Sequence, residues 1–257
     1  MQSLETITRL YEACGFQARK FSCFRMLGLG AKDVGENLED EVGEAPTSSH
    51  NDIAFERKMW RTRKVTKLIS LLPFVRAVAI CNSLGFQMVH EDSDIDLFIV
   101  AAPGRVWSAR WWVTGVLALL RLRPGEARRD PICVSFFIDE SVEDLSELMI
   151  ERDVYFHYWL RALMPVFESH ILFERGAQAA PEFRIEQGEN LKKLQKIFES
   201  CAKIFSESWV KTQQLTLMPN SLRIRAAAED TDVVLSDTII KLHNNDRRAE
   251  LRDKVFE

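Results

Sequence analysis

The sequence predicts an α/β (α+β) protein in which a small mixed sheet packs against helices. Short apolar runs of strand type at 75–83, 93–102 and 132–138 alternate with helical segments in the middle of the chain. The composition agrees, because 46% apolar and 28% charged residues in a chain of 257 are ordinary for a globular protein with a large core. Helical segments are expected on both sides of this core. The predicted regions are 1–52, 53–175 and 176–257.

The first region is predicted to hold one helix followed by an acidic loop. Leu4, Ile7 and Leu10 give the N-terminal helix its apolar stripe, whereas 32–51 has no apolar periodicity. A second helix, over 53–72, leads into the first strand. Its basic residues are interpreted as a solvated helix face, although contact with a polyphosphate or nucleic-acid backbone stays open. They are Arg57, Lys58, Arg61, Arg63, Lys64 and Lys67.

Further helices are predicted between and after the strands. One covers 105–122, and a long one begins at Ser141, where a capping-box pattern stands. Apolar residues spaced by three and four predict a single amphipathic helix over 191–209. A last helix is expected near 231–254.

That last helix carries His243 and Arg247, which would share one side of it. Closure over a bound nucleotide is one interpretation of the two residues. A salt-bridged surface helix is the simpler one.

Charge and cysteine usage narrow the class of protein. A net charge of −4 gives no reason to expect a nucleic-acid coat protein or a polyacidic tail. The five cysteines form no C-x-x-C pair, which favours a reducing compartment. Glu5 and Arg9 interrupt any signal-peptide pattern, and the most apolar window, 111–120, is about half a membrane span. We therefore expect a cytoplasmic protein without a membrane partner.

The stretch from Cys81 to Val100 carries the chemistry. Asp94 and Asp96 stand two apart at the start of a strand, so both side chains are expected on one face. Two neighbouring carboxylates repel unless a hard divalent cation lies between them. Mg²⁺ typically takes one or two carboxylates and completes its shell with substrate phosphates. The pair therefore predicts a magnesium site.

These residues resemble the nucleotidyltransferase superfamily typified by DNA polymerase beta. That family has a strand, a Gly-Ser pair, a short helix and a strand bearing Asp-x-Asp. Here Asn82-Ser83 stands at the Gly-Ser position, and Ser83 lies eleven residues before Asp94. The flanking sequence is similar to stand-alone bacterial members described only as nucleotidyltransferase-domain proteins. The resemblance covers about twenty residues and implies a polymerase beta-like core at 53–175.

The resemblance also implies an activity and a ligand set. Two Mg²⁺ ions held by Asp94 and Asp96 would act on an NTP, moving its nucleoside monophosphate to a hydroxyl and releasing pyrophosphate. The turn at Asn82 and Ser83 would hold the triphosphate, and Arg105 either reaches it or lies over a neighbouring tryptophan. The acceptor, whether nucleic acid, protein or small molecule, is not indicated by any recognisable accessory domain.

Three positions depart from the family pattern. Asn82 replaces the first glycine, Gln87 replaces a later one, and the third strand has no central carboxylate. Asp139, at the end of that strand, is either the third carboxylate or the start of a turn into Ser141. The alternative function is therefore a catalytically impaired nucleotide-binding or protein-interaction module on the same fold.

Overall fold

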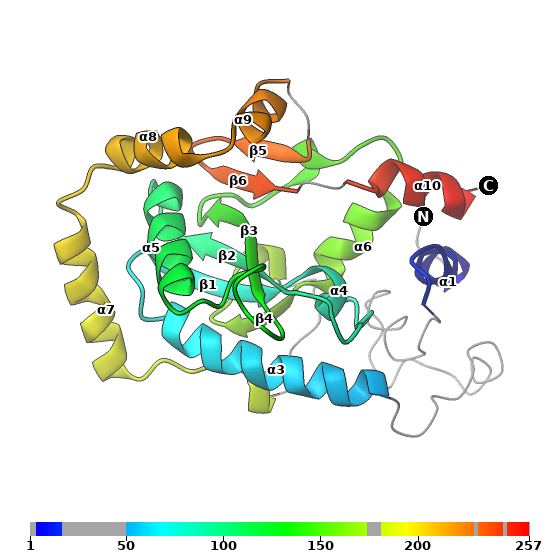
Figure 1. Ribbon diagram of the computed structural model, residues 1–257, viewed down its shortest axis with the longest axis horizontal. Helices are drawn as coiled ribbons and strands as arrows, with labels where there is room; N and C mark the ends of the chain where they lie inside the picture. Colours follow the sequence, from blue (N-terminus) through cyan, green and yellow to red (C-terminus); the bar gives the residue numbers. More distant parts are fainter. Residues whose placement is uncertain (1–3, 17–49, 174–180, 229–230, 244–245, 257) are drawn as a thin grey trace.

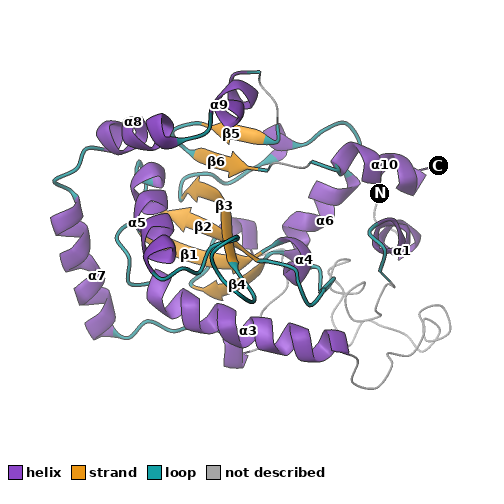
Figure 2. Ribbon diagram, viewed as in Figure 1, coloured by secondary structure: helices purple, strands orange, loops and turns teal. Residues whose placement is uncertain are grey.

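The computed structural model of the chain has a mixed α/β architecture (Figure 1). Strands and helices are distinguished by colour in Figure 2. The predicted acidic loop falls outside the described part of the chain up to residue 49. The residues that the structure describes are 4–16, 50–173, 181–228, 231–243 and 246–256.

Six strands in the described residues form one mixed sheet in the order β4-β1-β2-β3-β6-β5. β2 pairs with β3 in parallel, and the other neighbouring strands are antiparallel. The three strands predicted from the sequence are confirmed as β1, β2 and β3. The strands are β1 (Val75–Ile80), β2 (Ile95–Ala101), β3 (Ile132–Asp139), β4 (Met164–Phe167), β5 (Val233–Leu235) and β6 (Ile239–Leu242).

Helices cover both faces of the sheet, which explains why β2 reads as a continuous apolar run. Along β2, Leu97 and Ile99 point to one face and Phe98 and Val100 to the other. The helices that contribute to the first face are α3 (His50–Ile69), α5 (Val106–Leu119), α7 (Glu189–Ala202) and α8 (Glu207–Leu217). Those on the second face are α1 (Leu4–Ala13), α6 (Val154–Ala162) and α10 (Arg248–Phe256).

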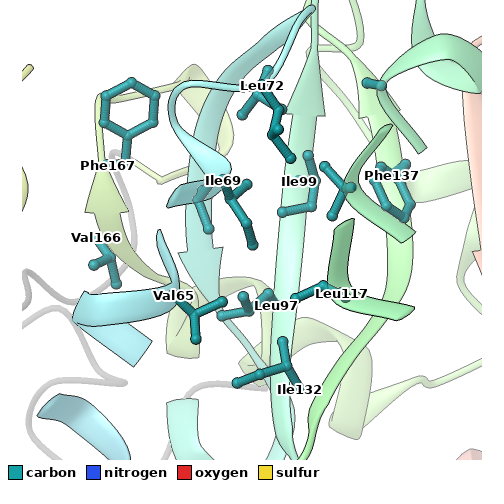
Figure 3. Packing of buried hydrophobic residues seen from close by; sticks show 14 of the residues in the cluster. Val65, Ile69, Leu72, Leu97, Ile99, Leu117, Ile132, Phe137, Val166 and Phe167 are labelled. Atoms are coloured by element: carbon teal, nitrogen blue, oxygen red, sulfur yellow. The ribbon is translucent and has the colours of Figure 1, made fainter. Parts of the chain in front are cut away.

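Figure 3 shows the core of the first face. Val65 and Ile69 of α3 pack with Leu97 and Ile99 of β2, and all four are buried. Leu117 brings α5 into the same cluster. The predicted helices over 53–72 and 105–122 are thus confirmed as α3 and α5. None of the helices in the described part of the chain combines the length and apolar character needed to cross a bilayer.

The prediction of a long helix that begins at Ser141 is wrong. Ser141 donates its backbone N–H and its hydroxyl to the Asp139 carboxylate, at 2.9 and 2.7 Å, so it closes a turn. A short 3₁₀ helix follows at Ser146–Leu148. α6 begins only after Asp153, whose carboxylate accepts the Phe156 N–H at 2.9 Å and caps the helix.

The predicted helix over 191–209 is two helices, α7 and α8. Ser206 interrupts it, because its hydroxyl accepts the Trp209 N–H and caps α8. α7 stands at the left margin of Figure 1 and buries only Gln195 and Ala202. Its apolar stripe is therefore largely exposed.

The helix predicted near 231–254 is wrong in its first half. β5 and β6 form an antiparallel hairpin there, and β6 pairs with β3 through Ile240 opposite Phe137. The pairing satisfies backbone groups that a helix would leave open on the edge of β3. The hairpin is flanked by two helices, α9 (Asn220–Ala227) before it and α10 after it. The C-terminal region thus completes the central sheet.

Candidate functional site

Asp94 immediately precedes β2, and Asp96 is the second residue of the strand, on the face of the sheet that α6 covers. Because β1 is antiparallel to β2, the end of β1 meets this point, and the Cys81 N–H donates to the Asp96 carbonyl at 3.0 Å. α4 (Asn82–Gly85) follows β1 directly. The structure therefore brings the predicted carboxylate pair beside the predicted Asn82-Ser83 turn.

Asn82 stands at the position where the family pattern has its first glycine. Its φ is +51°, in the left-handed region, which Asn tolerates better than most residues. Its side-chain oxygen accepts the Trp159 indole N–H at 2.7 Å, and its amide also hydrogen-bonds the Asp96 carboxylate. Gln87, at the second expected glycine, is left-handed as well, with φ +60°. Asn82 thus fixes one carboxylate of the pair against α6.

Gly85 allows α4 to pack closely on α6. A Cβ added there would lie 2.8 Å from the Ala162 carbonyl oxygen, which is too close for a backbone neighbour. Gly115, in α5, has open space around it.

We expect Gly85→Ala to lower the free energy of unfolding by about 1–3 kcal/mol, because the backbone of α6 or α4 must shift. Gly115→Ala is the control and should raise it by up to about 1 kcal/mol, since alanine favours a helix interior. Urea denaturation of both variants checks the pair. Equal effects would contradict the close approach of α4 and α6.

Desolvation raises the pKa of Asp96 to about 6, and the charge of Asp94 adds to this. Hydrogen bonds from Asn82 and Cys133 oppose the shift in part. Burial also raises the pKa of Asp94, against the attraction of Lys58. Burial and the Asp96 charge raise the pKa of Cys133 to about 12, so this thiol stays a protonated donor. A bound cation would relieve the cost of these two desolvated carboxylates.

Lys58, Arg57 and Asp130 hold the loop that leads into β2. Lys58 is fully buried, and its Nζ donates to the Asp130 carboxylate at 2.7 Å and to the Ser93 and Glu91 carbonyls at 2.6 and 3.1 Å. Arg57 binds both Asp130 oxygens, at 2.8 and 3.0 Å. The prediction of a solvated basic face is wrong for these two residues, which position the carboxylate pair.

A cavity of about 240 Å³ opens beside this end of the sheet. Asn82, Ser83 and Ser135 of β3 line it, whereas Asp94 and Asp96 are not among its lining residues. Asp96 adjoins the cavity through its hydrogen bond with Asn82. Its apolar wall consists of Phe86, Phe136, Tyr155, Phe156 and Trp159. A concave, largely aromatic surface next to a few polar groups suits a planar ring with a charged substituent.

The opposite wall of the cavity is basic and comes from the C-terminal region. Lys241, His243 and Arg247 line it together with Asp246. His243 follows strand β6 and Arg247 precedes α10, so the prediction that one helix carries both is wrong. Tertiary structure nevertheless brings both to the predicted site. Lys241 was not predicted as a site residue, because no local pattern marks the hairpin that carries it.

Arg248 anchors this wall to α6. It is buried, and its guanidinium contacts the carboxylates of Asp153, Asp232 and Asp246 at 2.9, 3.3 and 2.5 Å. Lys241 donates to the Thr231 carbonyl at 2.6 Å. Burial lowers its pKa to about 8.

Asp139 is not brought to the carboxylate pair. It pairs with Ala101, while Asp96 pairs with Cys133 at the other end of the parallel strands. Five residues of strand separate the two positions, or about 16 Å. The Asp139 carboxylate instead accepts the backbone N–H of Gly104.

An irregularity in the pairing also changes the phase of β3. From the Asp96–Cys133 pair to the Phe98–Phe136 pair, β2 advances two residues and β3 three. Phe136 therefore faces the same side as Phe98 and lines the cavity, whereas Phe137 turns to the other core. The sequence places Cys133, Ser135 and Phe137 on one face of this strand and Val134 and Phe136 on the other. That prediction is wrong for Phe136 and Phe137, because the irregularity exchanges their faces.

Arg105 also lies away from the carboxylates. It precedes α5, past the far end of β2, where its guanidinium stacks 5.1 Å from the Phe74 ring centre. Its Nη1 donates to the Phe205 carbonyl at 3.5 Å. Arg105 thus packs on an aromatic ring, but on Phe74 and not on the neighbouring tryptophan that was expected.

The two aspartates fit a hard divalent cation that takes most of its ligands from elsewhere. Both are oxygen donors with raised pKa values, and Lys58, the nearby cation, is bound to Asp130 and two carbonyls. Within the described residues, no group of three or more His, Cys, Asp or Glu side chains could hold a metal ion. Phosphate and water oxygens would have to complete the shell.

Comparison with known proteins returns no match. No protein-family model, no curated protein and no solved structure matches the chain. The resemblance to polymerase beta-like nucleotidyltransferases therefore rests on the motif around Ser83, Asp94 and Asp96.

Proposed function

We propose that this chain is a Mg²⁺-dependent nucleotidyltransferase with a polymerase beta-like core. The supporting observation is the meeting of the Asp94/Asp96 pair, the Asn82-Ser83 turn and one cavity at the same end of the sheet. Its reaction is attack of an acceptor hydroxyl oxygen on the α-phosphorus of an NTP. A new P–O bond forms, the bond to the β-phosphate breaks, pyrophosphate leaves, and the hydroxyl proton passes to solvent water.

Each part of the site has a role in this proposal. Asp94 and Asp96 hold Mg²⁺, which supplies charge neutralisation to the phosphates when bound. Asn82 fixes the Asp96 carboxylate, and Ser83 faces the phosphates. The aromatic wall around Trp159 receives the base, and the basic wall faces negative charge.

One observation favours a second candidate, a module that binds a nucleotide without transferring it. The position on β3 opposite Asp96 is Cys133, a thiol whose pKa is raised to about 12. A protonated thiol can donate a hydrogen bond to Asp96, but it cannot replace a carboxylate as metal ligand or base.

The test is incubation of the chain with each α-labelled NTP, Mg²⁺ and candidate acceptors, with assay of pyrophosphate and transferred label. We expect release by the wild type and none by Asp94→Asn/Asp96→Asn. Asp92→Asn, an exposed change in the same loop, should retain the activity. Release by the double variant would remove the pair from the mechanism. Calorimetric binding of NTP without any release would favour the second candidate.

A further inference from the structure

The loop over 120–131 extends the surface around the carboxylate pair. The Pro131 carbonyl accepts the Ile95 N–H at 2.8 Å, and the Ile132 N–H donates to the Leu122 carbonyl at 2.7 Å. Asp130 in the same loop is held by Arg57 and Lys58 of α3. The loop and α3 therefore lie side by side next to the start of β2 (Figure 1).

This surface is strongly basic in an acidic protein. Residues 50–69 and 120–131 together contain ten Lys and Arg side chains, of which Lys58 is buried, and four Asp and Glu side chains, whereas the whole chain has a net charge of −4. Such asymmetry produces a local positive potential that attracts polyanions. Asp94 and Asp96 are nearby acids, and a bound divalent cation would neutralise them.

Several cations are exposed, and they are spread over both parts of the surface. Lys64 lies on α3, and Arg121 and Arg128 lie on the loop. On α3, Lys64 continues a stripe with Arg61, whose Nε is fixed by the Asp130 carbonyl at 2.8 Å. Arg129 and Arg123 are paired with Glu91 and Glu126, so they contribute less.

Trp60 adds an aromatic surface to this stripe. It is 41% exposed, lies one helical turn before Lys64, and its ring is fixed edge-on by Phe183 at 5.2 Å. Exposed aromatic rings among cations are what proteins use to bind single-stranded nucleic acids, because bases stack on the rings while cations follow the phosphates. An acidic peptide would gain nothing from the ring.

We propose that the acceptor is a single-stranded nucleic acid whose backbone lies along α3 and the loop over 120–131. This places its terminal hydroxyl at the Asp94/Asp96 pair. The role as acceptor rests on the proposed function. The binding surface rests on its charges and on Trp60.

The test is fluorescence anisotropy of the full chain with a labelled single-stranded 20-nucleotide RNA, without NTP. Lys64→Glu/Arg121→Glu/Arg128→Glu should weaken binding at least tenfold and reduce the salt slope by about 2, from loss of three phosphate contacts. The control is Lys192→Glu/Lys193→Glu/Lys196→Glu on α7, which changes the net charge equally and should bind as wild type. A single-stranded DNA arm shows whether the sugar matters. Thermal melts verify that both variants fold.

Three outcomes would overturn the inference. They are no RNA binding by the wild type at physiological salt, equal loss in the α7 control, and equal affinity for an acidic peptide. Asp94→Asn/Asp96→Asn should still bind RNA while failing to release pyrophosphate. Failure of the proposed transfer activity is thereby separated from failure of this surface.

Discussion

Arg248→Met should lower the free energy of unfolding by about 3–5 kcal/mol, because it leaves buried carboxylates without their cation. Arg248 is 5% exposed and contacts Asp153, Asp232 and Asp246, which belong to three separate segments. Its loss should also detach α10 from α6 and open the basic wall of the cavity. Chemical denaturation measures the first effect, and amide exchange in 231–256 measures the second.

The control for this prediction is the adjacent residue. Arg247 is exposed and pairs with Glu250 at 3.0 Å on the surface, so Arg247→Met should change stability by less than about 1 kcal/mol. Arg247 lines the cavity, so the same change should weaken NTP binding. Similar destabilisation by the two variants would show that the buried ion pairs of Arg248 stabilise the fold no more than a surface ion pair does.

Asp96→Asn should raise the free energy of unfolding at pH 7.5 by about 2 kcal/mol in the absence of metal. The pKa of Asp96 is raised from 3.8 to about 6 in the folded state, so the folded chain holds this proton more tightly than the unfolded chain. The protonated Asp96 carboxyl therefore contributes its full stabilisation below about pH 4, and this contribution is lost as the pH rises towards 6. The advantage of the variant should therefore appear above pH 6 and vanish below pH 4.

Metal binding should also raise the stability of the folded chain, because the cation offsets the desolvated charge of Asp96. Mg²⁺ alone should raise the melting temperature of the wild type slightly, and Mg²⁺ with NTP should raise it more, because phosphates supply the missing ligands. Asp94→Asn/Asp96→Asn should respond to neither. A wild-type melting temperature that is unchanged by both together would argue against a metal site at this pair.

The local sequence was sufficient for the elements that form the centre of the site. Alternation and β-branched residues predicted β1, β2 and β3, and the spacing of two placed Asp94 and Asp96 together because strand geometry is local. Two helices, α3 before β1 and α5 after β2, were predicted from apolar spacing and from the breaks at Pro73 and Gly104. Ser83 could be placed because the chain between it and Asp94 is short.

Residues that reach the site from far along the chain could not be predicted. Trp159 meets Asn82 across 77 positions, and Lys58 meets Asp130 across 72. A basic run has the same local pattern whether it faces water or a buried carboxylate, so the burial of Lys58 was not predictable. The aromatic run at 155–159 was a visible signal, but helical periodicity does not say what its faces contact.

The sequence by itself determined the three central strands and the closeness of Asp94 to Asp96, since both depend on neighbours in the chain. Only the tertiary structure decided which other residues reach them. The hairpin over 233–242 pairs with the edge of β3, and this pairing brings His243 and Arg247 to the cavity. The irregular pairing of β3 after Cys133 turned Phe136 into the cavity, and strand length kept Asp139 away. Strand pairs and buried ion pairs join segments that are far apart in the chain, so a local sequence pattern cannot predict which segments meet.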